Sequence, residues 1–199
     1  MKPQITEQGY INAAKIIGCE VAAIKAVKEV ESGGSGFLPD GQCKILFEPH
    51  IFYRELMRKG IKPTISDICY PKWGTYKYGN VSEQHGKLQR AVLIDRECAL
   101  KSASWGLFQI CGFNYKNCGC KDVQEFVTRM IESEDSQLEL FAKFINNSGY
   151  ADELIDKRWK DFARLYNGAG FAKNQYDTKL AAAYKKYITR FSSGSVAQN

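Results

Sequence analysis

The stretch AIKAVKEVESGGSGFLPDGQCKILFEPH, residues 23–50, places two glutamates in apolar surroundings. Apolar side chains recur at helical spacing up to Glu31, and glycines at positions 33, 34 and 36 then interrupt the pattern. A short strand-like run follows and ends at Glu48. Because an ionised carboxylate is costly to hold among apolar side chains, the pattern predicts that the two glutamates are paired or take part in chemistry.

Helical geometry gives Glu31 an environment different from that of its neighbour Glu29. Glu31 follows Val27 by four positions and Ile24 by seven, which places it at the edge of the apolar face. Glu29 follows Lys25 by four positions and belongs to the solvent side. An apolar edge disfavours the ionised form of a carboxyl group, so Glu31 is the better candidate for a general acid. The glycines after it leave space for a bulky substrate.

The composition favours one globular domain. The chain has 199 residues, of which 44% are hydrophobic and 13% aromatic, and can bury a sizeable core. We expect a single domain over residues 1–191 and a flexible tail over residues 192–199. The net charge of +6 favours an anionic partner such as nucleic acid, a membrane surface or the bacterial envelope. The sequence shows no basic stripe with interleaved aromatics, which argues against nucleic acid, and no run of about 18 apolar residues, which argues against membrane insertion.

The N-terminus and the cysteines bear on compartment and metal binding. The first residues lack the uninterrupted apolar region of a signal peptide, which predicts synthesis in the cytoplasm. Seven cysteines are an odd number, and without a secretion signal most should be thiols. Cys111, Cys118 and Cys120 are close in sequence, but their spacing matches no usual zinc site and the chain has two histidines. We predict no metal site.

The periodicity predicts a mainly helical fold with a small β-hairpin. In the hairpin, the turn PDGQ at 39–42 joins GFL to CKILFE. Residues 59–85 show no clear period, and so long an irregular segment indicates a functional loop, whose aromatic rings are candidates for stacking on sugars. The predicted helices cover residues 6–17, 20–31, 51–58, 86–101, 121–131, 134–147, 152–166 and 178–191.

Three motifs resemble the lysozyme-like superfamily, which includes goose-type lysozymes and lytic transglycosylases. They are VES at 30–32, SASWGLFQI at 102–110 and FARLYNGAG at 162–170, in that order. Within the superfamily, the chain is most similar to the N-acetylmuramidase family of phage endolysins and prophage proteins, from about residue 5 to residue 190. That similarity includes GCEVAAIKAVKEVESGGSGFLPDG, KILFEPHIFYR, SASWGLFQICGFNY and AKNQYDTKLAAAY.

The resemblance implies a lysozyme-like helical domain with a β-hairpin beside a catalytic cleft. It implies cleavage of the β-1,4 bond between N-acetylmuramic acid and N-acetylglucosamine in peptidoglycan, with Glu31 as the general acid and without a cofactor. The enzyme would act on the cell wall after release or export, and we expect a monomer. The residues that the resemblance assigns to substrate binding are His50, Ser104, Gly106, Gln109, Tyr166 and Asn167.

The second carboxylate and the exact chemistry stay open at the level of sequence. Glu48 shares a strand face with His50 and belongs to the family pattern, which makes it the first candidate. Asp40 is the alternative, although turn chemistry also explains its place in PDG. A lytic transglycosylase would use the same Glu31 to form 1,6-anhydro products, and a non-catalytic peptidoglycan-binding module would need no acid.

Overall fold

The computed structural model describes residues 4–32 and 34–194. Within these ranges the fold is mainly helical, with a three-stranded antiparallel sheet of order β1-β2-β3. The strands are β1 (Ile45–Phe47), β2 (Ala103–Trp105) and β3 (Ile110–Cys111). The helices are α1 (Glu7–Ile17), α2 (Val21–Glu31), α3 (Pro49–Arg58), α4 (Gln84–Ile94), α5 (Arg96–Lys101), α6 (Val123–Met130), α7 (Glu134–Asn147), α8 (Ala151–Ile155), α9 (Trp159–Asn167) and α10 (Tyr176–Gly194). Short 3₁₀ turns cover Val81–Glu83, Gly112–Asn114 and Gly168–Asn174.

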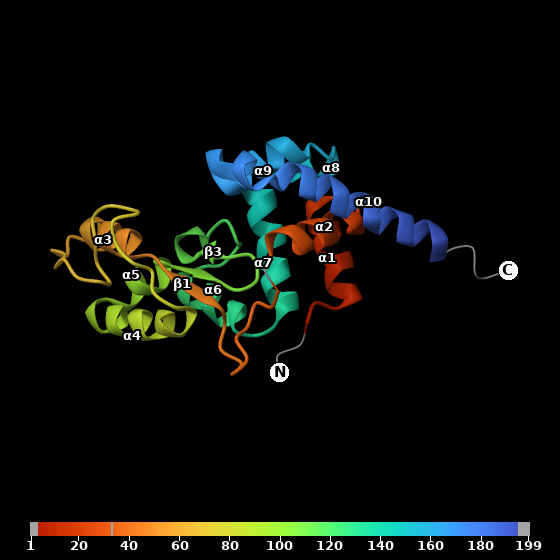
Figure 1. The fold of residues 1–199 in the computed structure, drawn as a ribbon. Helices are drawn as coiled ribbons and strands as arrows, with labels where there is room; N and C mark the ends of the chain where they lie inside the picture. Colours follow the sequence, from red (N-terminus) through yellow and green to blue (C-terminus); the bar gives the residue numbers. More distant parts are fainter. Residues whose placement is uncertain (1–3, 33, 195–199) are drawn as a thin grey trace.

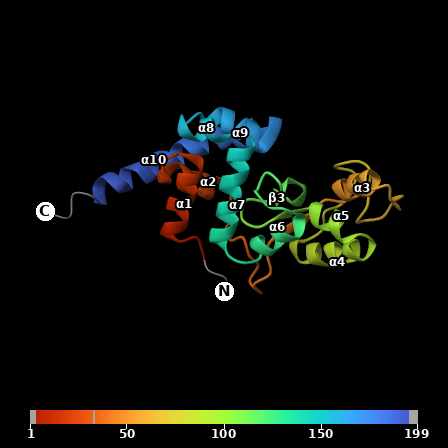
Figure 2. The ribbon, with the colours of Figure 1, turned by 180° about the vertical axis from the view of Figure 1, so that it is seen from behind.

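Two lobes meet at the central helix α7. Figure 1 shows α1, α2, α8, α9 and α10 on one side of α7, which we call the helical lobe, and the sheet with α3 to α6 on the other, which we call the sheet lobe. The view from behind in Figure 2 shows the same division. Buried side chains surround α7, including Leu138, Leu140, Phe141 and Ile145. The side chains of Glu139 and Lys143 stay partly exposed, so α7 is buried around most of its circumference and keeps a narrow polar stripe toward solvent.

The sheet has one face in the core and one partly open face. Leu46 of β1 is opposite Ser104 of β2, which is opposite Cys111 of β3, and all three side chains are partly exposed. Their neighbours on the other face, such as Phe47 and Trp105, are buried. Because side chains alternate along a strand, the open face continues from Leu46 to Glu48.

The predicted hairpin forms as a short pairing around its turn. The amide of Leu38 donates to the carbonyl of Gln42 (2.8 Å), the amide of Lys44 donates to the carbonyl of Gly36 (2.8 Å), and Phe37 and Cys43 form an antiparallel bridge. The strand β1 that follows pairs in addition with residues 103–105, far along the chain. The local sequence carried the turn signal but could not show which distant strand would complete the sheet.

Three further boundaries differ from the sequence-based expectation. The helix predicted over 152–166 is divided into α8 and α9, with Lys157 at a φ of +59° between them. The helix predicted over 86–101 is divided at Asp95, whose carboxylate accepts a hydrogen bond from the amide of Cys98 (2.9 Å) and so caps α5. The predicted tail over 192–199 lies mostly outside the described residues, and α10 extends to Gly194. None of the helices in the described ranges has the length and apolar character required to cross a membrane.

Candidate active site

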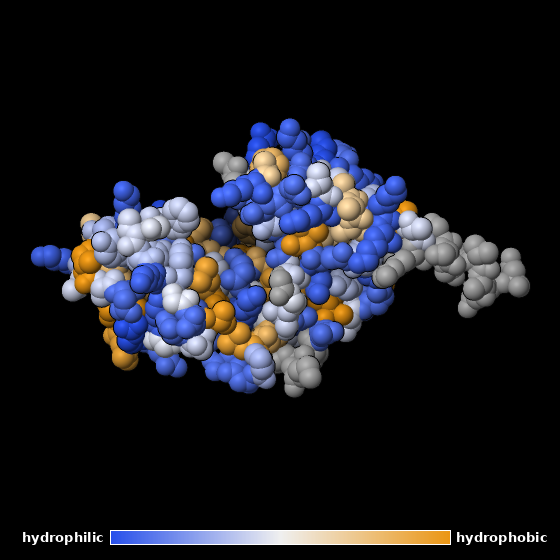
Figure 3. Space-filling model, in the orientation of Figure 1, coloured by the Kyte–Doolittle hydropathy of each residue, from blue (hydrophilic) through white to orange (hydrophobic). Residues whose placement is uncertain are grey.

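A pocket of about 420 Å³ lies where the two lobes meet. It is lined by the last residue of α2, by the segment Phe108 to Cys111, by the end of α9 and by Tyr176 at the start of α10. In Figure 3 the surface is indented between the sheet lobe and the α9–α10 region of the helical lobe. The pocket therefore joins residues from all three motifs that the sequence singled out.

Glu31 reaches this pocket from the C-terminal end of α2, where its side chain is partly buried. Nδ2 of Asn167, the last residue of α9, donates a hydrogen bond to its Oε1 (2.8 Å). Burial raises the pKa of Glu31, and the hydrogen bond from Asn167 partly opposes that rise. Of the three glycines after the helix, Gly33 lies outside the described residues, and Gly34 has a φ of +117° with open space around its Cα.

Glu29 differs from Glu31 as the helical geometry predicts, since its side chain is exposed on the opposite face of α2. It was expected beside Lys25. The structure pairs it with α10, where Nζ of Lys186 and the hydroxyl of Tyr187 both donate to Oε2 (2.7 Å each), and it pairs Lys25 with Glu7 (2.8 Å). Glu29 therefore links α2 to α10.

Gly106 and Gln109 form the turn between β2 and β3. Gly106 has a φ of +70°, and a Cβ there would lie 2.7 Å from the side-chain amide of Gln137. Nε2 of Gln109 donates to the carbonyl of Gly106 (2.8 Å), which leaves its Oε1 to accept from a ligand in the pocket. The structure thus gives Gly106 a packing reason to be glycine, whereas the predicted close approach of a sugar stays a prediction.

Tyr166 has its hydroxyl group occupied by the protein. The hydroxyl donates to the carbonyl of Phe108 (2.9 Å), and the ring stacks on Phe162 with a centroid distance of 5.6 Å. Burial and the nearby charge of Glu31 raise the pKa of Tyr166 well above its usual value. Tyr166 therefore serves first to hold the turn of the sheet lobe against α9, and its predicted contact with substrate stays a prediction.

Glu48 stands immediately before α3, with its side chain 14% exposed. Its Oε2 accepts hydrogen bonds from the hydroxyls of Tyr78 (2.7 Å) and Tyr76 (3.2 Å), and Nδ1 of His50 lies 3.4 Å away. Two of the loop aromatics, Tyr76 and Tyr78, thus contact Glu48 through their hydroxyl groups, and the expected stacking of the loop on sugars stays a prediction. Trp73 of the same loop is 68% exposed.

The open face of the sheet connects the surroundings of Glu31 with those of Glu48. Cys111 lines the pocket of Glu31 and lies opposite Ser104. Ser104 lies opposite Leu46, two residues before Glu48 on the same face. Burial, with the charge of Glu48 as the next contribution, raises the pKa of Cys111 to about 12. Glu48 is thus close to a residue that forms the wall of the pocket.

Asp40 is accounted for by its turn. Its Oδ1 accepts from the amide of Gln42 (2.9 Å), an arrangement that mimics a backbone turn, and the side chain is exposed. The loop that carries it projects from the lower edge of the molecule in Figure 1. Among the described residues, the pocket of Glu31 is lined without Asp40.

Two polar residues of α7 support the site and were missed by sequence reasoning. Oε1 of the buried Gln137 accepts from the amide of Leu107 (2.7 Å), and its Nε2 donates to the carbonyl of Met130 (2.7 Å). Oε1 of the buried Glu134 accepts from the amide of Gly36 (2.8 Å). Both residues are polar positions within the helix expected over 134–147. A buried polar group needs partners, but only the structure shows that these two positions are buried.

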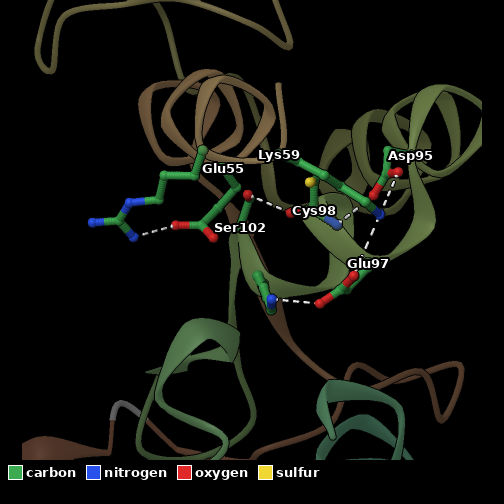
Figure 4. Close-up of polar contacts among 8 residues, drawn as sticks. Glu55, Lys59, Asp95, Glu97, Cys98 and Ser102 are labelled. Carbon is green, nitrogen blue, oxygen red and sulfur yellow. Dashed lines mark hydrogen bonds and ion pairs between the residues drawn. The ribbon is translucent and has the colours of Figure 1, made fainter. Parts of the chain in front are cut away.

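A second polar cluster, shown in Figure 4, lies apart from the pocket and ties α3 to α5. Nζ of Lys59 lies 2.7 Å from Asp95 and 3.3 Å from Glu97, and the hydroxyl of Ser102 donates to the carbonyl of Cys98 (2.6 Å). Each of these groups has a protein partner, so the cluster is structural.

The cysteines form no disulfide in the described part of the chain. Cys118 and Cys120 are buried, and burial raises the pKa of Cys118 to about 12. Within the described residues, no group of three or more His, Cys, Asp and Glu side chains is arranged to hold a metal ion.

A mainly helical two-lobed domain, with a half-buried glutamate at a helix end facing a small antiparallel sheet, defines a lysozyme-type glycoside hydrolase. The model of the N-acetylmuramidase family matches residues 20–188. The chain belongs to the N-acetylmuramidase family, as its motifs predicted, and is a lysozyme-type enzyme that degrades peptidoglycan.

Comparison with solved structures supports the same assignment. The chain is similar to the crystal structure of the Burkholderia AP3 phage endolysin, with 40% sequence identity and a TM-score of 0.87. The match covers 94% of this chain and 72% of that one. A search of curated proteins found no significant match. The predicted lysozyme-like fold is confirmed.

Proposed function

We propose that this enzyme hydrolyses the β-1,4 bond between N-acetylmuramic acid and N-acetylglucosamine in peptidoglycan, with Glu31 as general acid. The observation that carries the proposal is the position of Glu31, partly buried at the wall of the pocket with its pKa raised by burial. A raised pKa favours the protonated form that a general acid needs near neutral pH.

The contacts of Glu31 suggest how the proton is delivered. Because Asn167 donates to Oε1, the proton is best carried on Oε2. Transfer of this proton to the glycosidic oxygen allows the bond from that oxygen to the anomeric carbon of N-acetylmuramic acid to break, with positive charge developing on the sugar ring. Asn167 then stabilises the carboxylate that Glu31 becomes.

Glu48 is the candidate for the second carboxylate. It would accept a proton from water while the water oxygen bonds to the anomeric carbon, so that the product is a reducing N-acetylmuramic acid. Two features support the assignment: hydroxyl donors stabilise an ionised carboxylate at this position, and Glu48 shares the open face of the sheet with the pocket wall.

The test is analysis of digested, purified peptidoglycan by mass spectrometry. We expect muropeptides that end in reducing N-acetylmuramic acid. Mainly 1,6-anhydro ends would show a lytic transglycosylase, and reducing N-acetylglucosamine ends would show that the wrong bond was assigned.

The role of Glu31 is tested with a matched pair of substitutions in one helix. Glu31→Gln keeps size and hydrogen bonding but cannot deliver a proton, so turnover should fall at least about a hundredfold. Glu29→Gln makes the same change at an exposed site that contacts α10, and turnover should stay near that of the wild type. Equal losses in the two variants would show that Glu31 is not the proton donor.

A further inference from the structure

Three polar side chains meet at one oxygen atom of Glu48. Oε2 lies 2.7 Å from the hydroxyl of Tyr78, 3.2 Å from that of Tyr76 and 3.4 Å from Nδ1 of His50. Nδ1 of His50 also lies 2.7 Å from the hydroxyl of Tyr76. The three contacts to Glu48 all fall on Oε2, which leaves Oε1 as the oxygen atom that can meet a water molecule.

The available protons fix the direction of these bonds. The short contact to Oε2 uses the hydroxyl proton of Tyr78. Burial lowers the pKa of His50, against the opposing charge of Glu48, so the ring is mainly neutral at pH 7 and carries one proton. With that proton on Nδ1, His50 donates to the oxygen of Tyr76, and the hydroxyl proton of Tyr76 lies between Oε2 of Glu48 and the oxygen of Tyr78, each 3.2 Å away. With it on Nε2, the proton of Tyr76 turns to His50 instead and Glu48 loses a donor.

We propose that Tyr78 and Tyr76, the latter oriented by His50, are positioning residues that hold Glu48 as a carboxylate with Oε1 directed to the attacking water. This inference rests on the proposed role of Glu48 as second carboxylate. It assigns a function to the irregular loop between α3 and α4, which supplies both tyrosines.

The loop is anchored well enough for this role. Nε2 of the buried Gln84 donates to the carbonyl of Tyr78 (2.7 Å), and its Oε1 accepts from the amide of Phe47 in β1 (3.1 Å). Nζ of Lys87, also buried, donates to the same carbonyl (2.8 Å). The backbone of Tyr78 is therefore fixed to the strand that leads to Glu48, and the hydroxyl position follows from a packed structure.

Other titratable groups also surround Glu48. His50 and Arg54 project from α3, and Cys111 faces it from β3. The guanidinium of Arg54 lowers the pKa of both His50 and Cys111, so a positive charge is also close. A test of the tyrosines must therefore separate their effect from that of these groups, which the substitutions below leave in place.

The experiment compares Tyr78→Phe, Tyr76→Phe and Tyr70→Phe by kcat and KM on soluble glycan strands from pH 4 to 9. Tyr70 belongs to the same loop, and its ring packs against that of Tyr76 (6.3 Å between centroids), so Tyr70→Phe controls for loss of a hydroxyl group alone. We expect Tyr78→Phe to lower kcat at least about tenfold with little change in KM. A fall in kcat at unchanged KM separates loss of positioning from a general loss of the cleft, which would also weaken binding. The alkaline limb of the pH profile, set by Glu31, should stay in place. Tyr76→Phe should act in the same direction and Tyr70→Phe should change nothing.

A double substitution separates positioning from structure. In a Glu48→Gln background, Tyr78→Phe should cause no further loss of the residual rate, since its effect passes through Glu48. A further loss of rate in the Glu48→Gln background would overturn the inference. So would Tyr78→Phe and Tyr76→Phe variants whose kcat and pH profile equal those of Tyr70→Phe. If Glu48→Gln itself retains near-normal turnover, the assignment of the second carboxylate fails and the inference fails with it. If Glu48→Gln is inactive and the tyrosine variants keep normal turnover, the positioning role of the tyrosines is wrong and the role of Glu48 stands.

Discussion

Gly106→Ala is expected to destabilise the enzyme because it acts on a buried amide beside the pocket. The residue has a φ of +70°, and a side chain in this left-handed region costs about 1–2 kcal/mol. The new Cβ would lie 2.7 Å from Cδ and Oε1 of Gln137, which must move away from the amide of Leu107 or the carbonyl of Met130. An unpaired buried polar group costs about 1–3 kcal/mol, so the free energy of unfolding should fall by about 2–5 kcal/mol.

Gly60→Ala is the matched control. Its φ of +78° imposes the same backbone strain, but nothing lies within 4 Å of the position of the new Cβ. We expect a loss of about 1–2 kcal/mol, measured for both variants from urea unfolding with the slope unchanged. Turnover should fall only in Gly106→Ala, because the same turn carries Gln109. Equal losses of stability in the two variants would refute the proposed clash with Gln137.

Three other outcomes follow from the charges and thiols. The raised pKa of Glu31 makes the wild type lose stability as pH rises from about 4.5, the usual pKa, to the pKa of the folded state, by about 1.4 kcal/mol per pH unit. Glu31→Gln lacks this loss, so its stability relative to the wild type should rise over the same range. Urea unfolding at pH 4 and pH 8 measures the difference in stability, and a difference that does not change with pH would contradict the prediction. Chelators and mild reductants should leave turnover and Tm nearly unchanged, whereas a loss that zinc restores would indicate a metal site. Residues 157–194 carry nine basic and two acidic side chains, so salt should weaken activity on intact cell walls more than on short glycan fragments; equal effects would argue against long-range attraction.

Helices were predictable from the sequence where one face is apolar, and the sheet was not. Helix α2 ends at Glu31 and α7 covers residues 134–147, as their periodicity indicates. The pairing of Leu46 with Ser104 joins segments far apart in the chain, and nothing in either short run specifies the other. The capping carboxylate of Asp95 divided a helix that looked continuous. Local signals therefore located the elements, while side-chain partners across the fold decided how they were divided and joined.

The site was predictable residue by residue but not as a set of contacts. The family resemblance assigned Asn167 to substrate binding, and the structure adds its hydrogen bond to Glu31. Tyr78 belongs to the irregular segment 59–85, which was expected to be a functional loop. The sequence could not show that its hydroxyl group donates a hydrogen bond to Glu48. Gln137 was hidden because it looks like any polar residue on a helix until its buried partners are known.

The two carboxyl groups differ in a way that matches the roles proposed for them. Glu31 is partly buried with a single amide donor, so desolvation favours its protonated form. Glu48 receives two phenol hydroxyls at one oxygen atom, and donors of this kind stabilise a carboxylate. Both residues stand at a helix end, Glu31 at the last position of α2 and Glu48 immediately before α3. Because both groups are glutamates, the difference between the proposed acid and the proposed base comes from their surroundings: burial for Glu31 and hydroxyl donors for Glu48. In the proposed mechanism, Asn167, Tyr76 and Tyr78 set these environments and so take part in the chemistry through the glutamates that they contact.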